Sequence, residues 1–153
     1  MAIELVSVNL PEQPVLFIRT HAAMADLPQT IGTSYHKIMS YMEKLAIEPS
    51  DAPYTAYYNL DMANLDVEMG FPTAKKMSGN DTVQSGVIPA GLAVTCLYKG
   101  SYQGMGPVYE AMNRWIAEHH YRPTGIAYEY YYNSPDEVPE SELLTKVVLP
   151  YEL

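Results

Sequence analysis

Residues 128–135 read Tyr-Glu-Tyr-Tyr-Tyr-Asn-Ser-Pro, and the organisation of the chain follows from this stretch. A run so rich in tyrosine, ended by Asn-Ser-Pro, predicts a β-strand that closes in a turn. Side chains alternate between the two faces of a strand, so Glu129 shares a face with Tyr131 and Asn133. If that face lines a cavity, Glu129 is a carboxylate among aromatic rings, which suits an organic cation. If it faces water, Glu129 is an ordinary solvated residue.

The beginning of this stretch occurs twice in the chain. When residues 31–59 are shifted onto residues 105–133, several residue types coincide. The matching pairs are Gly32 and Gly106, Tyr35 and Tyr109, Pro49 and Pro123, Tyr54 and Tyr128, Tyr57 and Tyr131, Tyr58 and Tyr132, and Asn59 and Asn133. Repetition on this scale indicates a duplicated supersecondary unit. Glu129 matches Thr55, so the carboxylate is not part of the shared scaffold, and this difference favours a functional role for it.

Hydrophobic spacing predicts the order β-α-β-β in each half of the chain. The expected elements are strands at 3–9 and 15–19, a connection at 21–30, a helix at 31–45, strands at 54–59 and 65–71, a polar connection at 73–86, a strand at 91–98, a helix at 107–119, and strands at 128–133 and 143–149. We therefore expect one α+β domain over residues 1–153, with pseudo-repeats at about 1–72 and 82–153. Its mostly antiparallel sheet should carry both helices on one face and a ligand cleft between the halves.

The composition and charge limit which partners and ligands we expect. The 153 residues are 48% hydrophobic and 18% charged, as in folded water-soluble proteins, and the formal charge is −9. That charge argues against nucleic acid or an anionic membrane as a partner and favours cationic ligands. The N-terminus lacks the pattern of a signal peptide, so we expect a cytoplasmic protein. Since no metal-ligand spacing occurs, no metal or cofactor is expected. The 14 Tyr and 9 Met suit a pocket for varied ligands.

The repeat, together with Gly100-x-Tyr102, Trp115 and Glu129-x-Tyr131-x-Asn133-x-Pro135, resembles the GyrI-like small-molecule-binding domain. That family is the effector-binding domain attached to AraC-type and MerR-type multidrug regulators, and it also occurs alone. The resemblance extends over nearly the whole chain, down to the closing residues 145–150. One departure is Ser134, where the family usually has Asp before the proline. This is a turn position, so the departure leaves the implied pocket intact.

The resemblance implies that Glu129 lies at the base of an aromatic cleft and meets lipophilic cations. A desolvated carboxylate is costly unless a counter-charge arrives, and each aromatic face adds about 0.5–2 kcal/mol of cation–π attraction. The expected aromatic walls are Tyr131, Trp115, Tyr102 and Tyr57, followed by Tyr35, Tyr109 and Phe71. On this interpretation the chain is a ligand sensor or sequestering protein that does not itself bind DNA.

Two alternatives come from the same resemblance. Some stand-alone relatives are thought to be hydrolases of electrophilic compounds, in which a carboxylate such as Glu129 would serve as nucleophile or general base and a nearby Tyr as proton donor. No feature of the sequence selects catalysis, so a binding role is preferred. Other relatives inhibit DNA gyrase, and a protein-interaction role of that type would be indifferent to Glu129.

Overall fold

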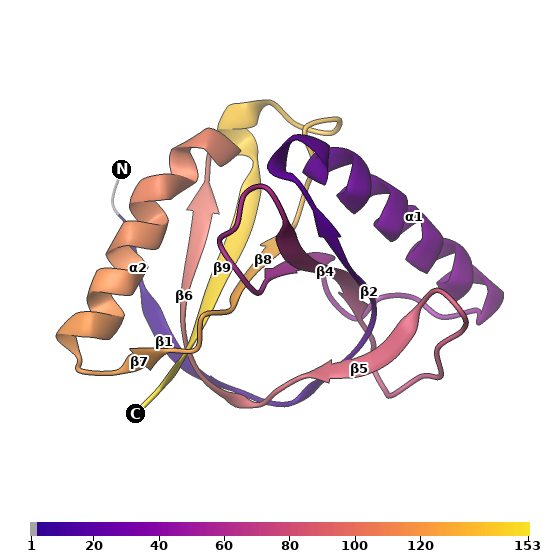
Figure 1. Ribbon diagram of the computed structural model, residues 1–153, viewed down its shortest axis with the longest axis horizontal. Coiled ribbons are helices and arrows are strands. Elements are labelled where there is room, and N and C mark those ends of the chain that lie inside the picture. Colours follow the sequence, from indigo (N-terminus) through magenta and orange to yellow (C-terminus); the bar gives the residue numbers. More distant parts are fainter. Residues whose placement is uncertain (1–2) are drawn as a thin grey trace. The chain divides into compact units, whose positions relative to one another are not determined.

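The structure is a computed structural model that describes residues 3–153 (Figure 1). Its strands are β1 (Val6–Leu10), β2 (Gln13–Ala22), β3 (Tyr54–Tyr57), β4 (Leu65–Pro72), β5 (Gln84–Ile88), β6 (Gly91–Lys99), β7 (Arg122–Pro123), β8 (Ala127–Tyr131) and β9 (Leu144–Glu152). Its helices are α1 (Leu27–Lys44) and α2 (Gly106–Glu118), with short 3₁₀ turns η1 (Met24–Asp26), η2 (Tyr102–Met105) and η3 (Glu140–Glu142). The predicted α+β class is confirmed.

Helix α1 begins at Leu27 rather than at the predicted Ile31. Pro28 lies in its first turn, where a missing backbone N–H costs no helical hydrogen bond. The prediction that residues 21–30 form only a connection was therefore wrong at both ends, because β2 extends to Ala22 and α1 begins at Leu27. The prediction that Pro107 lies in the first turn of the second helix is confirmed.

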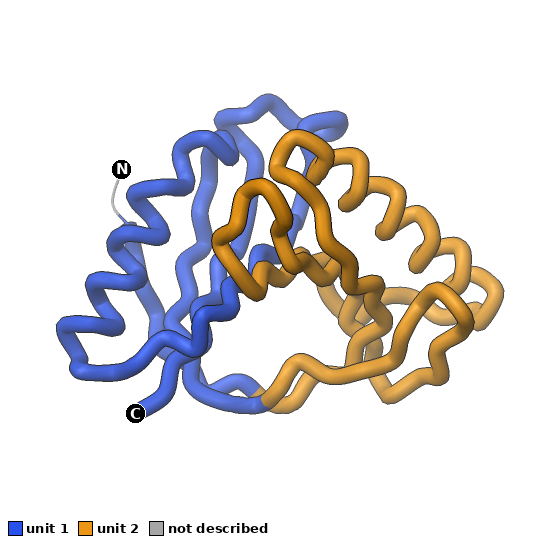
Figure 2. Tube along the Cα trace, viewed as in Figure 1, with its two compact units in different colours: residues 1–10, 90–153 blue, residues 11–89 orange. Residues whose placement is uncertain are grey.

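The chain divides into two compact units, which Figure 2 shows in different colours. Unit 2 is Pro11–Pro89, and its strands lie in the order β3-β4-β2-β5. Unit 1 joins the segment that ends at Leu10 to Ala90–Leu153, and its strands lie in the order β8-β9-β6-β1. Each unit is thus a β-α-β-β run with one added edge strand, and in unit 1 the two-residue strand β7 also pairs with β9. The pairing within both units is antiparallel.

In unit 2, helix α1 packs on one face of the strands. The residues of this core come from the helix, from β2 and β4, and from the approach to β5: Leu16, Ile38, Met42, Phe71 and Val83. Leu16 lies opposite Phe71 in the register of β2 and β4, so both side chains reach the same face. A second cluster on α1 and β4, formed by Leu27, Leu65, Val67 and Met69, continues the core.

In unit 1, helix α2 lies along its strands in the same way (Figure 1). Met112 and Ile116 of the helix are buried against Val94 of β6 and Val147 of β9. This face of the sheet is called here the α2 face. Within residues 3–153, neither helix is long and apolar enough to cross a membrane.

Candidate functional site

Glu129 points toward the α2 face of unit 1. In the pairing of β8 with β9 it lies opposite Val147, which is fully buried in the core beneath α2. Its neighbours Tyr128 and Tyr130 alternate onto the other face of the sheet, where both are buried. The Glu129 side chain is therefore directed at the helix and is only partly exposed, unlike an ordinary solvated residue. That this face lines a ligand cavity stays a prediction.

Two tyrosines hold the Glu129 carboxylate. The hydroxyl of Tyr109, in the first turn of α2, donates a hydrogen bond to Oε2. The hydroxyl of Tyr131, two residues along β8, donates to Oε1 at 2.8 Å. Each carboxylate oxygen thus has a phenolic donor, and the orientation of the group is fixed from the helix and from the strand.

Tyr102 adds an aromatic ring next to this pair. It lies in η2, just before α2, and its ring centroid is 6.0 Å from that of Tyr131 with the planes at 73°. Such an edge-to-face contact is a favourable arrangement for two aromatic rings. Because the Tyr102 side chain is 40% exposed, its ring stands at the rim of the site.

Burial destabilises the ionised form of the Glu129 carboxylate. Burial raises the pKa of Glu129, and the hydrogen bonds from Tyr109 and Tyr131 offset only part of that rise. The pKa of Tyr102 is also raised, chiefly by burial and further by the negative charge of Glu129. In the part of the chain that the structure describes, the ion pairs are Arg19 with Asp66 and Arg122 with Glu152, so Glu129 has no basic side chain to neutralise it.

Thr145 is a neighbour of this site that the sequence did not single out. It pairs with Tyr131 across β8 and β9 and with Tyr98 across β9 and β6, so it lies on the α2 face. Its side chain is 1% exposed, and its hydroxyl has no hydrogen-bond partner within residues 3–153. Only the strand register reveals this position, because nothing in the local sequence marks it.

The structure places Trp115, one of the expected wall residues, in an aromatic cluster toward the other end of α2. Its ring stacks on that of His119, with the centroids 4.1 Å apart. Its centroid lies 5.9 Å from that of Tyr121 and 5.5 Å from that of Tyr151. Tyr121 and Tyr151 are themselves stacked at 4.6 Å. These contacts account for Trp115 as a packing residue of unit 1, and a place for it in a ligand wall stays a prediction.

The remaining expected residues, Tyr35, Tyr57 and Phe71, belong to unit 2. There the hydroxyl of Tyr35 lies 3.0 Å from Oγ1 of Thr55, and its ring contacts Phe71 edge-on at 5.4 Å. Tyr57 packs on the cluster of α1 and β4 that contains Val67. Unit 2 therefore holds a neutral counterpart of the pair formed by Tyr109 and Glu129. Participation of these residues in ligand binding stays a prediction.

The structure contains a second tyrosine-bound carboxylate, which the sequence did not indicate. Glu68 on β4 is 6% exposed, and its two oxygens accept hydrogen bonds from Tyr54 at 2.6 Å and Tyr58 at 2.9 Å. The guanidinium carbon of Arg19 lies 3.7 Å from the centroid of the Tyr58 ring, and the guanidinium donates a bidentate pair of hydrogen bonds to Asp66. Glu68 thus lies close enough to Arg19 to interact with its charge, although Arg19 is paired with Asp66, whereas no cation is paired with Glu129 within residues 3–153. Within residues 3–153, no three His, Cys, Asp or Glu side chains are grouped to hold a metal ion.

Several solved structures are similar to this chain. EcmrR, in a cryo-EM structure of its complex with DNA, matches with a TM-score of 0.83 and 21% identity over 98% of this chain and 57% of the EcmrR chain. A hydrolase from Listeria innocua matches with a TM-score of 0.72 and 11% identity over 97% of this chain and 92% of its own. SAV2435 bound to tetraphenylphosphonium matches with a TM-score of 0.64 and 8% identity, over 99% and 94%.

At these identities the likeness shows a shared fold, and this chain spans little more than half of EcmrR. No curated protein matches the chain. The model of one family, described as the GyrI-like small molecule binding domain, matches residues 4–152. The chain therefore belongs to the family of GyrI-like small molecule binding domains.

Proposed function

We propose that this chain binds lipophilic, aromatic organic cations, with the Glu129 carboxylate as their counter-charge. The observation that carries the proposal is that Glu129 is desolvated, held at both oxygens by tyrosine hydroxyls, and not paired with a basic side chain in the described chain. A buried carboxylate in this state is costly, and a bound cation would offset that cost.

The aromatic surroundings favour an organic cation over a metal ion or a small inorganic cation. Tyr131 and Tyr102 present rings beside the carboxylate, and an aromatic face attracts a large, weakly hydrated cation. Such a site selects its ligands by charge and aromatic surface rather than by hydrogen bonding, because both carboxylate oxygens already accept hydrogen bonds from the protein. The similarity to SAV2435, which was solved with tetraphenylphosphonium, supports the same ligand class.

In this proposal the chain acts as an effector-sensing or sequestering module, with the ligand-binding role of its family. The similarity to EcmrR supports a connection with regulators, since that protein was solved in complex with DNA.

The binding proposal is tested with tetraphenylphosphonium in isothermal titration calorimetry. We expect Glu129→Gln to weaken binding at least tenfold at neutral pH, because the amide keeps the shape of the side chain and removes the charge. The matched control is Glu68→Gln, which alters the other tyrosine-bound carboxylate and should leave the affinity within about twofold. Equal affinities of the wild type and Glu129→Gln would reject the proposal. Circular dichroism of both variants shows whether each is folded.

Hydrolysis of an electrophilic ligand is the second candidate. It is favoured by the contact of the carboxylate with two phenolic O–H groups, which could donate a proton while Glu129 acts as nucleophile or base. The similarity to the Listeria innocua hydrolase supports it as well. Mass spectrometry of an electrophilic cyclopropane-bearing compound incubated with the protein distinguishes the two candidates. Turnover that Glu129→Gln abolishes would establish catalysis, whereas an unchanged compound supports binding alone.

A further inference from the structure

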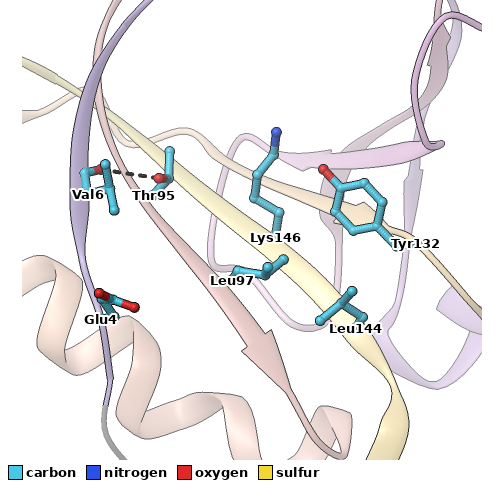
Figure 3. A pocket seen from close by; sticks show the side chains of 7 residues that line it. All are labelled: Glu4, Val6, Thr95, Leu97, Tyr132, Leu144 and Lys146. Carbon is cyan, nitrogen blue, oxygen red and sulfur yellow. Dashed lines mark hydrogen bonds between the residues drawn. The ribbon is translucent and has the colours of Figure 1, made fainter.

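A pocket on the other side of the unit 1 sheet has no part in the site around Glu129. Its volume is about 330 Å³, and side chains of β1, β6 and β9 line it together with Glu4, which precedes β1, and Tyr132. The lining residues are Glu4, Val6, Thr95, Leu97, Tyr132, Leu144 and Lys146 (Figure 3). Lys146 lies opposite Tyr130 in the pairing of β8 and β9, whereas Glu129 lies opposite Val147. Successive residues of a strand face opposite ways, so the sheet separates Lys146 from Glu129.

The floor of this pocket is apolar and exposed. Leu97 is 61% exposed and Val6 is 51% exposed, and both project from regular strands of the sheet. Leu144 adjoins them, and the ring of Tyr132, 41% exposed, borders the floor. A group of exposed apolar side chains in a concave surface commonly marks a binding site. The volume is at the small end of the roughly 300–1,000 Å³ typical of ligand pockets, which suits a chain of medium length.

One end of the pocket offers donors to an anion. The ammonium of Lys146 lies 4.6 Å above the ring of Tyr130 and, within residues 3–153, forms no ion pair. In Figure 3 the Lys146 side chain rises from the floor, and the Tyr132 hydroxyl is directed toward it. An ammonium and a phenolic O–H on the same side of an apolar floor match a carboxylate with a hydrocarbon tail.

The remaining charge in the pocket, that of Glu4, does not reverse this choice. Continuation of the pairing of Val6 with Thr95 places Glu4 across from Leu97, and Leu97 in turn pairs with Lys146. Glu4 and Lys146 are thus two strand spacings apart, about 10 Å. Glu4 is exposed, so salt screens its effect on a carboxylate at Lys146 over that distance. An organic cation is disfavoured because Lys146 already covers the aromatic face of Tyr130.

We propose that this pocket binds a medium-chain aliphatic carboxylate, with the head group at Lys146 and Tyr132 and the tail on Leu97, Leu144 and Val6. The protein would then hold two ligands of opposite charge on opposite faces of the unit 1 sheet. This second site does not depend on the cation site, because no residue is shared between them.

The test uses decanoate below its micellar concentration, titrated into protein labelled with ¹³C at the Leu and Val methyl groups. We expect saturable shifts of the Leu97, Leu144 and Val6 methyl signals. Lys146→Met should weaken binding at least tenfold, while the matched surface variant Lys44→Met leaves it unchanged. Leu97→Glu, at an exposed position that tolerates a charge, should also abolish binding. Glu129→Gln should have no effect, and Glu4→Gln should leave binding equal or tighter.

Several outcomes would overturn the second site. These are the absence of saturable shifts, shifts that map elsewhere in the chain, or equal binding by wild type and Lys146→Met. Tighter binding of decyltrimethylammonium than of decanoate to the same methyl groups would also overturn it, because the pocket would then be a cation site. If Glu129→Gln loses tetraphenylphosphonium binding but keeps decanoate binding, the two sites bind their ligands independently.

Discussion

The hydroxyl of Tyr109 donates to Oε2 of Glu129, and this hydrogen bond has a neutral counterpart between Tyr35 and Thr55 in the other unit. The two pairs occupy matching positions of the internal repeat. Both units thus contain a helix-to-strand hydrogen bond at these positions, and in unit 1 the partner of the tyrosine is a carboxylate. A hydroxyl and a carboxylate that make equivalent hydrogen bonds differ mainly in charge, so the difference between the two units at these positions is electrostatic.

The first prediction concerns pH. The pKa of Glu129 is raised above the ordinary glutamate value, mainly by burial. A cation binds the ionised carboxylate, so affinity should be constant above the raised pKa and fall as the pH drops through it, by up to tenfold per pH unit. The fall should begin at a higher pH than an ordinary glutamate would give. Calorimetry with tetraphenylphosphonium across pH 4–8 measures the profile, with Glu129→Gln as the control.

Proton release provides an independent check on the same prediction. Since binding ionises the fraction of Glu129 that is protonated, titrations near its pKa should release protons, and the apparent enthalpy should depend on the ionisation enthalpy of the buffer. Glu129→Gln should give a flat profile without that dependence. A wild-type profile that is equally flat over the whole range would show that Glu129 does not carry the charge that the ligand meets.

The second prediction concerns the tyrosines that hold the carboxylate. Both hydrogen bonds lower the pKa of Glu129, so Tyr109→Phe and Tyr131→Phe should each move the midpoint of the pH profile further upward. Affinity well above the midpoint should change little in Tyr109→Phe. The matched control is Tyr35→Phe, which removes the equivalent hydroxyl beside Thr55. It should leave the midpoint in place, and a shift of equal size in that variant would contradict the assignment.

The sequence was sufficient for the repeat and for the α+β class, because both depend on local periodicity and residue type. It also identified Glu129, Tyr131, Tyr102 and Tyr109 as candidates, and the structure brings these four together. The orientation of Glu129 could be stated only as a choice. Alternation along a strand shows which residues share a face, and only the pairing of strands distant in sequence shows which face packs against a helix.

The same reason explains what the sequence missed. Glu68 was overlooked because its donors, Tyr54 and Tyr58, lie on and after a neighbouring strand and meet it only through the register of β3 and β4. Thr145 and the pocket of Leu97 and Lys146 likewise depend on the order of strands in unit 1. The register of a sheet is a long-range property, and residue spacing within one strand does not determine it.

The third prediction concerns the aromatic rim. Tyr102 is well exposed and contacts the ring of Tyr131, so its replacement should cost binding energy without unfolding the protein. A cation–π contribution of about 0.5–2 kcal/mol corresponds to a loss of affinity of roughly 2- to 30-fold in Tyr102→Leu. Tyr102→Phe keeps the ring and should bind almost as the wild type does. If the two variants lose affinity equally, the hydroxyl rather than the ring makes the contact.

The fourth prediction concerns the support of Glu68 and tests the fold of unit 2. A Cβ at Gly70 would lie 2.6 Å from the hydroxyl oxygen of Tyr54 and 2.7 Å from two carbons of its ring. Tyr54 is fully buried and donates its hydroxyl to Glu68, so its ring has no free space into which it could move. Gly70→Ala should therefore destabilise the protein by about 1–3 kcal/mol, as overpacking of a core usually does.

The matched control for this substitution is Gly32→Ala in helix α1. A Cβ there meets no atom within 4 Å, and alanine favours a helix over glycine by roughly 0.5–1 kcal/mol. Thermal unfolding followed by circular dichroism should show a lower midpoint for Gly70→Ala and a slightly higher one for Gly32→Ala. A Gly70→Ala variant as stable as the wild type would mean that Tyr54 does not lie over Gly70. The hydrogen bond from Tyr54 to Glu68 would then also be in error.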